Sequence, residues 1–297
     1  MIRLKCPAKV NLNLRIAGRR KDGYHLLDSL VAPIDWFDYL NLEAADSLNF
    51  ECSFTRQGRL PLGEDNLVMR AARALAAYAG IRRPGAAIQL QKNLPIGAGL
   101  GGGSSNAAAC LRGLNQLWQL GLADDELRVI ALSLGADIPF FIRPRPARLR
   151  GVGEQLTPVE LKPLTLLLLV PQVHCDTAHV YKTYAAHARE RNPSPQLTCR
   201  PAGVPFPPLS EACNHLTPAV LAAYPQLGEL LGELERLTAN QPEGGDWRFS
   251  GSGSCLYRPC VSAQEADELA ERAERTGARL AASARVVTTL HAWRQGE

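Results

Sequence analysis

One segment constrains this chain more than any other, the run PIGAGLGGGSSN at residues 95–106. It holds five glycines within the seven residues 97–103. Glycine loses more backbone entropy on folding than any other residue, so a run of this kind is costly to keep ordered. An alternating stretch, IQLQ, precedes the run, and a helical pattern, AAACLRGLNQLWQL, follows it. A glycine loop between a strand and a helix N-terminus is suited to binding a phosphate, because its N–H groups converge and the helix adds partial positive charge.

Three other interpretations compete for this loop. A Walker loop requires a lysine after its last glycine, and none follows here. A dinucleotide fingerprint matches at Gly97, Gly99 and Gly102, but it requires a strand that ends in an acidic residue about 20 positions later. At that distance Asp124 and Asp125 open a second predicted helix instead. A flexible hinge is the third interpretation, and a strand leading into a helix capped by residues 104–106 argues against it.

The remaining patterns predict a mixed α+β protein. Alternation predicts strands within residues 2–14 and 39–54, joined by turns such as the one at residues 21–23. Apolar periodicity predicts helices at residues 66–79, 107–120, 124–134 and 263–275 and after Pro225, and further strands at 164–170, 247–250, 255–258 and 285–290. Residues 192–210 hold six prolines, which predicts irregular structure. A chain of 297 residues is long enough for two cores, and we place an N-terminal domain at 1–155 and a C-terminal domain at 156–297.

Composition excludes several classes of function. The net charge is +4 and the basic residues are spread along the chain, which argues against nucleic-acid binding. Eight cysteines without a C-x-x-C pair are expected to be reduced thiols, and no metal-ligand cluster is expected. The most hydrophobic run, residues 164–170, is far shorter than the roughly 20 residues that span a bilayer. With no secretion signal at the start, we expect a soluble, cytoplasmic protein that binds no membrane.

Two charged residues are candidates for catalysis of phosphate transfer, which requires positioning and a proton acceptor. Asp137 is the candidate base, since it precedes an apolar Ile-Pro-Phe-Phe run in which a carboxylate needs a partner. Strand alternation places Lys9 and Asn11 on one face, where the lysine would keep Asp137 ionised. Two alternatives stay open at this point: Asp137 as a local backbone cap, and a solvent-facing strand that carries Lys9.

Three motifs occur in the order found in a known superfamily. They are PAKVNL at residues 7–12, the glycine run, and FSGSGSCLY at residues 249–257. Together they resemble the GHMP kinase superfamily over almost the whole chain. The resemblance implies an N-terminal domain like the second domain of ribosomal protein S5, a ferredoxin-like C-terminal domain, and an active site in the cleft between them. It also implies ATP as co-substrate, with Mg²⁺.

Further segments narrow the resemblance. RKDGYHLLDSL, LGADIPFF and DTAHVYKTY are similar to the branch that phosphorylates the 2-hydroxyl of a cytidine-diphosphate-linked methylerythritol in non-mevalonate isoprenoid (terpenoid) synthesis. A kinase of the homoserine or mevalonate class is the alternative within the superfamily. A nucleotide-binding regulatory or dinucleotide protein is the alternative outside it. Residues 214–218 read NHLTP where that branch commonly has N-D-x-E-P, so the role of this segment is open.

The resemblance also implies a set of site residues. It assigns catalysis to Lys9 and Asp137. Substrate binding falls to Asn11, Tyr24, His25, Tyr181, Gly251 and Ser252, with the two tyrosines and the histidine holding the cytosine ring. Ordinary packing of the aromatic residues and an ordinary hairpin turn at residues 251–254 are the alternatives. ATP binding falls to Asn66, Lys92, Pro95, Ile96, Gly97, Ala98, Gly99, Leu100, Gly101, Gly102, Gly103, Ser104 and Ser105. No dedicated metal ligands are expected beyond a serine such as Ser105, and the protein is expected to be a monomer or a weak homodimer.

Overall fold

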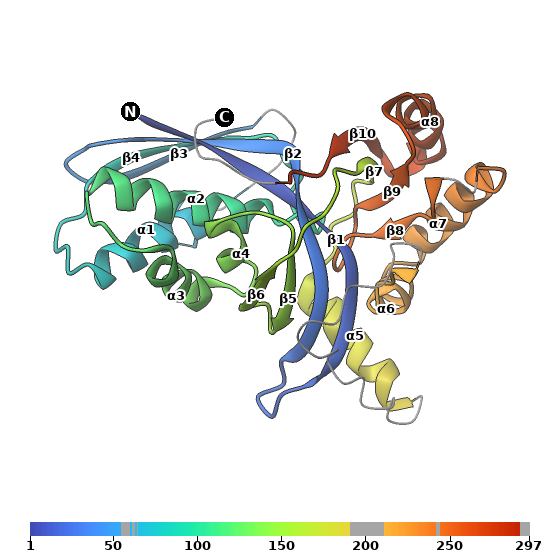
Figure 1. The fold of residues 1–297 in the computed structure, drawn as a ribbon, viewed down its shortest axis with the longest axis horizontal. Coiled ribbons are helices and arrows are strands. Elements are labelled where there is room, and N and C mark those ends of the chain that lie inside the picture. The colour runs from blue at the N-terminus through green and yellow to red at the C-terminus, as the bar shows by residue number, and fades with distance from the viewer. Residues whose placement is uncertain (55–59, 61–62, 64, 191–210, 242–243, 292–297) are drawn as a thin grey trace.

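A long antiparallel hairpin runs through the middle of the molecule (Figure 1). The computed structural model describes all residues except 55–59, 61–62, 64, 191–210, 242–243 and 292–297. Strand β1 (Ile2–Arg19) pairs with β2 (His25–Glu43) in a register that runs from Ile2 opposite Leu42 to Arg19 opposite His25. The predicted turn at residues 21–23 closes the hairpin, and Gly23 adopts a φ of 95° there, which glycine tolerates without steric cost.

The hairpin belongs to a six-stranded sheet with four helices on one face. The strand order is β3-β4-β2-β5-β6, with β1 paired to β2, and only β3 and β4 run parallel among these pairs. The added strands are β3 (Leu48–Phe54), β4 (Ala86–Lys92), β5 (Ala147–Gly151) and β6 (Gln155–Pro158). The helices are α1 (Leu67–Tyr78), α2 (Gly102–Leu117), α3 (Asp124–Leu134) and α4 (Ile138–Ile142).

A second, four-stranded antiparallel sheet follows, in the order β10-β7-β9-β8. Its strands are β7 (Thr165–Val170), β8 (Arg248–Phe249), β9 (Leu256–Cys260) and β10 (Ser283–Thr288). The helices on this side are α5 (Thr177–Glu190), α6 (Thr217–Ala223), α7 (Pro225–Thr238) and α8 (Ala263–Thr276), with a short 3₁₀ turn at Ala278–Leu280. Helix α5 lies beside the far end of the hairpin (Figure 1).

A shared core joins the two sheets. Each sheet has its own buried cluster, and a third cluster packs Val10 and Leu12 of the hairpin against Leu168 and Tyr257 of the second sheet. The Tyr257 hydroxyl also donates a hydrogen bond to the Leu12 carbonyl at 3.1 Å. Since burying such an apolar side chain contributes about 1.5–3 kcal/mol, this cluster holds the two halves together firmly. The α+β class is confirmed, whereas the boundary between residues 155 and 156 stays a prediction.

Most predicted elements are confirmed, and one helix start is wrong. Helices α1, α3 and α8 begin and end within two residues of their predicted limits, and α7 begins at Pro225, where a helix was expected to follow. Helix α2, however, begins at Gly102, inside the glycine run, and Gly101 precedes it in a left-handed conformation without a side-chain cap. The predicted caps at residues 104–106 lie within the helix, where Asn106 donates to the buried carboxylate of Asp38. The proline-rich residues 192–210 lie outside the described residues.

Candidate active site

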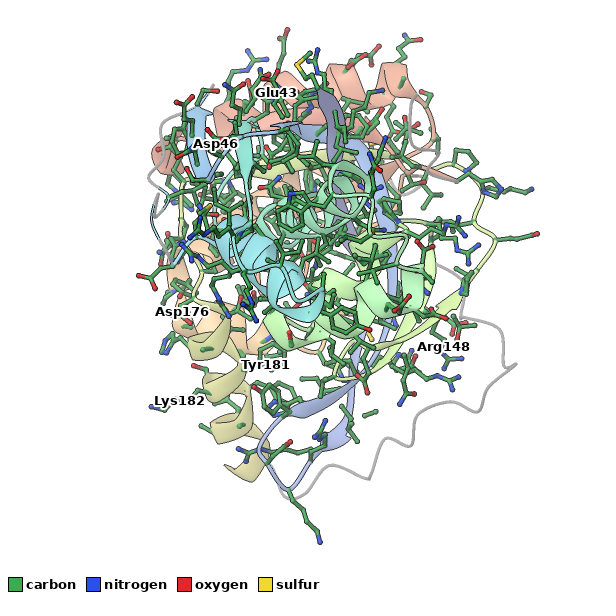
Figure 2. The ribbon with its side chains drawn as sticks, turned by 90° about the vertical axis from the view of Figure 1, so that its left-hand side faces the viewer. Glu43, Asp46, Arg148, Asp176, Tyr181 and Lys182 are labelled. Atoms are coloured by element: carbon green, nitrogen blue, oxygen red, sulfur yellow. The ribbon has the colours of Figure 1, made fainter. Side chains whose placement is uncertain are left out.

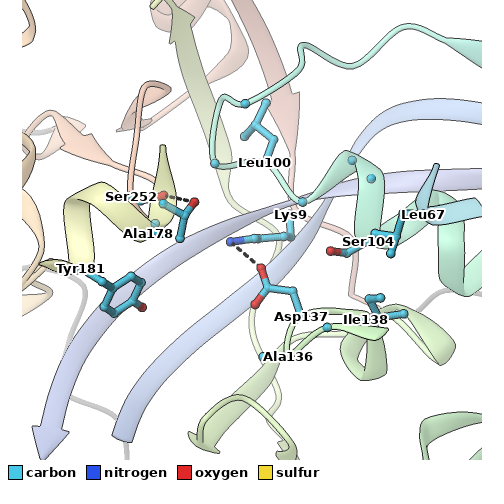
Figure 3. A pocket seen from close by; sticks show the side chains of 18 of the residues that line it. Lys9, Leu67, Leu100, Ser104, Ala136, Asp137, Ile138, Ala178, Tyr181 and Ser252 are labelled. Atoms are coloured by element: carbon cyan, nitrogen blue, oxygen red, sulfur yellow. Dashed lines mark hydrogen bonds and ion pairs between the residues drawn. The ribbon is translucent and has the colours of Figure 1, made fainter. Parts of the chain in front are cut away.

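A cavity of about 1230 Å³ lies where the hairpin, the glycine loop, helix α5 and the turn after β8 meet. Every residue predicted for the site lines this cavity except Ser105. Residues that are far apart in the sequence, from both sides of the predicted boundary, therefore share one cavity. Figure 3 shows its centre, with Lys9 pointing toward Asp137, Ser104 on one side and Tyr181 on the other.

Lys9 and Asp137 form the charged centre of the cavity. The Lys9 ammonium lies 3.7 Å from the Asp137 carboxylate and donates a hydrogen bond to Asn11 Oδ1 at 2.5 Å. Only 6% of Lys9 is exposed, so the interpretation of a solvent-facing strand is wrong. Asp137 stands just before α4 and makes no side-chain cap hydrogen bond there, so local capping does not account for it. Its carboxylate is about half exposed, with 48% of the side chain accessible to solvent.

Asn11 is fixed by neighbours from three segments. Its side-chain amide donates to Ser29 Oγ at 2.9 Å, and its backbone N–H donates to Ser250 Oγ at 3.3 Å. Gly251 lies directly against it, since a Cβ at that glycine would stand 3.3 Å from Asn11 Oδ1 and 3.6 Å from the Lys9 ammonium. The backbone at residue 251 therefore borders the charged centre, and its contact with substrate stays a prediction.

The glycine loop is clamped between β1 and the turn after β8. Lys9 N–H donates to the Leu100 carbonyl at 2.9 Å, and Cys255 N–H donates to the Ala98 carbonyl at 3.2 Å. Gly99 has a φ of 75°, and a Cβ there would stand 2.3 Å from the Ser250 carbonyl oxygen. Side chains at residues 98 and 100 are buried and anchor the loop, whose residues 97–103 all line the cavity.

Two predicted ATP contacts have structural partners of their own. Asn66 caps α1, with its Oδ1 accepting from Val68 N–H at 2.8 Å. Lys92 forms a buried ion pair with Asp38. Both side chains also line the cavity, so a role toward ATP stays a prediction for each.

An aromatic wall closes the end of the cavity near the hairpin turn. The His25 and Tyr181 rings lie 5.3 Å apart, and the Tyr184 ring meets His25 edge-on at 5.6 Å. Tyr24 is 63% exposed beside them. Partial burial, and then the nearby Arg19, lower the pKa of His25, while burial and then Asp137 raise the pKa of Tyr181. Figure 2 shows Tyr181 and Lys182 on α5 near this end of the hairpin.

Sequence reasoning missed several residues that support the site. Thr177, at the start of α5, shares a hydrogen bond of 2.9 Å with Ser252. Asn214 donates to the carbonyls of Phe249 and Gly251, at 3.0 and 2.7 Å. The NHLTP segment, whose role was open, thus braces the turn that carries Gly251. Tyr184 had a readable signal, because it lies one helical turn after Tyr181.

Oxygen ligands for a divalent cation are present at the cavity. The Ser104 side chain and the Asp137 carboxylate both line it, and hydroxyl and carboxylate oxygens suit Mg²⁺. The Ser105 hydroxyl is buried and has no hydrogen-bond partner, although it lies off the cavity lining. Within the described part of the chain, no three His, Cys, Asp or Glu residues gather in a way that would hold a metal. Nor does any helix of that part have the length and apolarity to cross a membrane.

Fold and site together define a kinase of the GHMP type, with a glycine loop, an adjacent lysine and aspartate, and a cavity between two sheets. A family model described as the GHMP kinases N terminal domain matches residues 66–144. The chain is 38% identical over 292 residues to a 4-diphosphocytidyl-2-C-methyl-D-erythritol kinase of Methylococcus capsulatus, covering 98% of this chain and 94% of the relative. It is 36% identical over 272 residues to the enzyme of that name from Alcanivorax borkumensis, covering 91% and 86%.

A solved structure agrees with these relatives. The crystal structure of a 4-(cytidine 5'-diphospho)-2C-methyl-D-erythritol kinase superposes with a TM-score of 0.71 at 32% identity, covering 97% of this chain and 98% of that one. The chain therefore belongs to the 4-diphosphocytidyl-2-C-methyl-D-erythritol kinase family.

Proposed function

We propose that the protein transfers the γ-phosphate of ATP to the 2-hydroxyl of 4-diphosphocytidyl-2-C-methyl-D-erythritol, giving the 2-phosphate and ADP. The observation that carries this proposal is the Lys9 and Asp137 pair, 3.7 Å apart, in a cavity bordered by the glycine loop and by an aromatic wall. Family membership supports the choice of substrate.

Asp137 acts as the general base. It accepts the proton of the 2-hydroxyl while that oxygen bonds to the γ-phosphorus, and the bond from this phosphorus to the bridging oxygen of ADP breaks. Lys9 stands beside the carboxylate and is held in place by Asn11. From there its ammonium counterbalances the negative charge on the attacking oxygen and on the phosphoryl group.

The glycine loop holds the triphosphate. Residues 97–103 line the cavity at the start of α2, where the helix N-terminus favours negative charge. Mg²⁺, when bound, would neutralise phosphate charge, and a serine hydroxyl such as that of Ser104 would hold it together with the phosphates. ATP as co-substrate fits this arrangement without a Walker lysine.

The aromatic wall selects the cytidine end of the substrate. A cytosine ring can stack on Tyr24 or Tyr181, and the imidazole of His25 can hydrogen-bond its edge. Gly251 and Ser252 line the same cavity, and Gly251 borders the charged centre, where the erythritol would lie. Homoserine and mevalonate carry no cytosine ring, so a kinase of either class would not need this pocket. Such a kinase is therefore the second candidate function.

A coupled ADP-release assay with 4-diphosphocytidyl-2-C-methyl-D-erythritol and Mg-ATP tests the proposal. Turnover is expected, with CDP as a competitive inhibitor against the cytidyl substrate. Turnover of homoserine or mevalonate without CDP inhibition would favour the second-ranked class, and saturable NADH binding that ATP does not displace would favour a dinucleotide protein. The monomer or weak dimer, the cytoplasmic location and the absence of nucleic-acid and membrane binding stay predictions.

A further inference from the structure

Asp38 of β2 is a buried carboxylate that nothing in the proposed reaction uses. It is 0% exposed and accepts hydrogen bonds from four donors. They are the Lys92 ammonium, Asn93 N–H at 2.7 Å, Leu94 N–H at 2.7 Å and Asn106 Nδ2 at 2.9 Å. Burying a charge is strongly unfavourable without such partners, so this arrangement depends on all of them.

The four donors frame the glycine loop from both ends. Lys92 ends β4, residues 93 and 94 lead from β4 into the loop, and Asn106 lies in the second turn of α2. One carboxylate therefore ties the entry of the loop to the helix that leaves it. The spacing between these two ends decides how closely the loop N–H groups converge.

Asp38 also orients a cation toward the loop. The Lys92 ammonium would stand 2.9 Å from a Cβ at Gly102, the first residue of α2, and Lys92 lines the cavity. A Walker loop carries its lysine after the last glycine, whereas here the lysine comes from the strand before the loop. Its direction is set by the ion pair with Asp38.

We propose that Asp38 is a positioning residue of the phosphate-binding loop, which fixes both loop ends and aims Lys92 at the nucleotide. The proposal rests on the proposed function only in taking ATP as the ligand of this loop. A purely structural ion pair would stabilise the sheet without distinguishing ATP from the other substrate.

The test compares two ligands in the full-length protein. Asp38→Asn is expected to weaken binding of a non-hydrolysable ATP analogue, and to raise KM for ATP, by about tenfold or more, because a tenfold change needs the loss of only a hydrogen bond to a charged group. Binding of CDP and KM for the cytidyl substrate should change by less than about twofold. Calorimetry measures both ligands without requiring turnover, so the result stands even if the wild-type protein proves inactive on the proposed substrate.

Two further variants keep the test decisive. Asp38→Asn leaves the Lys92 charge buried, so the double variant Asp38→Asn/Lys92→Met, which removes both charges, is expected to fold and to show the same selective loss for the ATP analogue. Asp28→Asn is the matched control, because Asp28 is another buried carboxylate on β2, which is 4% exposed, pairs with Arg148 at 2.6 Å and does not line the cavity. Asp28→Asn should lower the melting temperature without weakening the binding of the ATP analogue more than the binding of CDP. Equal losses for both ligands, or unchanged ATP-analogue binding in both Asp38 variants, would overturn the proposal.

Discussion

The ammonium of Lys9 on β1 lies 3.7 Å from the carboxylate of Asp137, which stands just before α4. The hairpin and the helices of the first sheet bring these two residues together from distant parts of the chain. The pair stands next to the glycine loop through the hydrogen bond from Lys9 N–H to the Leu100 carbonyl. The backbone of Lys9 thus braces the glycine loop, while its side chain forms an ion pair with Asp137, the proposed base.

Replacing Asp137 should greatly lower the rate of phosphate transfer and hardly change the binding of either substrate. For Asp137→Asn we expect kcat to fall by roughly 10²–10⁴-fold, the usual contribution of a positioned general base, with KM for both substrates nearly unchanged. Steady-state ADP release measures both parameters. Asp125→Asn is the control, since Asp125 is an exposed carboxylate paired with Arg128 on α3 and should leave kcat unchanged. Undiminished turnover in Asp137→Asn would rule out the base.

Two glycines of the loop should respond oppositely to alanine. At Gly99 the left-handed φ of 75° and the Ser250 carbonyl, 2.3 Å from a Cβ, oppose a side chain, so we expect a loss of at least about 1–2 kcal/mol in stability. Gly103 lies in α2 with nothing within 4 Å of a Cβ, so alanine there should be neutral or stabilise by about 0.5–1 kcal/mol. Thermal unfolding compares the two, and equal melting temperatures for Gly99→Ala and Gly103→Ala would contradict this account of the loop.

The aromatic wall should bind cytidine in a pH-dependent way. Burial and then Arg19 lower the pKa of His25 below its usual value of 6.5, so the neutral imidazole is favoured at neutral pH and the ring gains its proton at a more acidic pH than an ordinary histidine. We expect cytidine affinity to be constant between pH 8 and 7 and to change only in the acidic range. Cytidine is preferred to CDP because it has no phosphate that ionises there.

His25→Gln provides the control for this pH dependence. Glutamine keeps hydrogen-bonding capacity without an ionisable ring, so the acidic change in cytidine affinity should disappear. If the same change persists in His25→Gln, another group is responsible, and His25 does not contact the base.

Removing the brace at Asn214 should affect the cytidyl substrate. Asn214→Ala leaves the Phe249 and Gly251 carbonyls without this donor, which typically costs about 1–3 kcal/mol when a buried group loses its partner. We expect KM for the cytidyl substrate to rise several-fold while KM for ATP changes little. Asn115→Ala is the control, because Asn115 braces the turn between α2 and α3, far from Gly251, through bonds of 3.0 Å to Leu122. A rise in KM of the same size in both variants would show a general loss of order instead.

Local patterns were sufficient for several of the regular elements and for part of the site. Helices α1, α3, α7 and α8 follow their apolar periodicity, since a helical period places side chains on one face whatever the rest of the chain does. The two-residue period of a strand likewise placed Lys9 and Asn11 side by side. The position of the glycine run between a strand and a helix was likewise predicted, because both flanking patterns are local.

Relationships between distant segments were decided by the tertiary structure. Asp38 carries no local signal, yet it gathers Lys92, the loop entry and Asn106, which is one of the residues that were expected to cap α2. The sequence by itself determined the periodic helices and several of the strands, because those preferences act over a few neighbouring residues. Only the packing of the hairpin between two sheets decided that Lys9 meets Asp137 and that Asn214 supports Gly251, because such contacts depend on long-range burial and on the partners that buried polar groups must find.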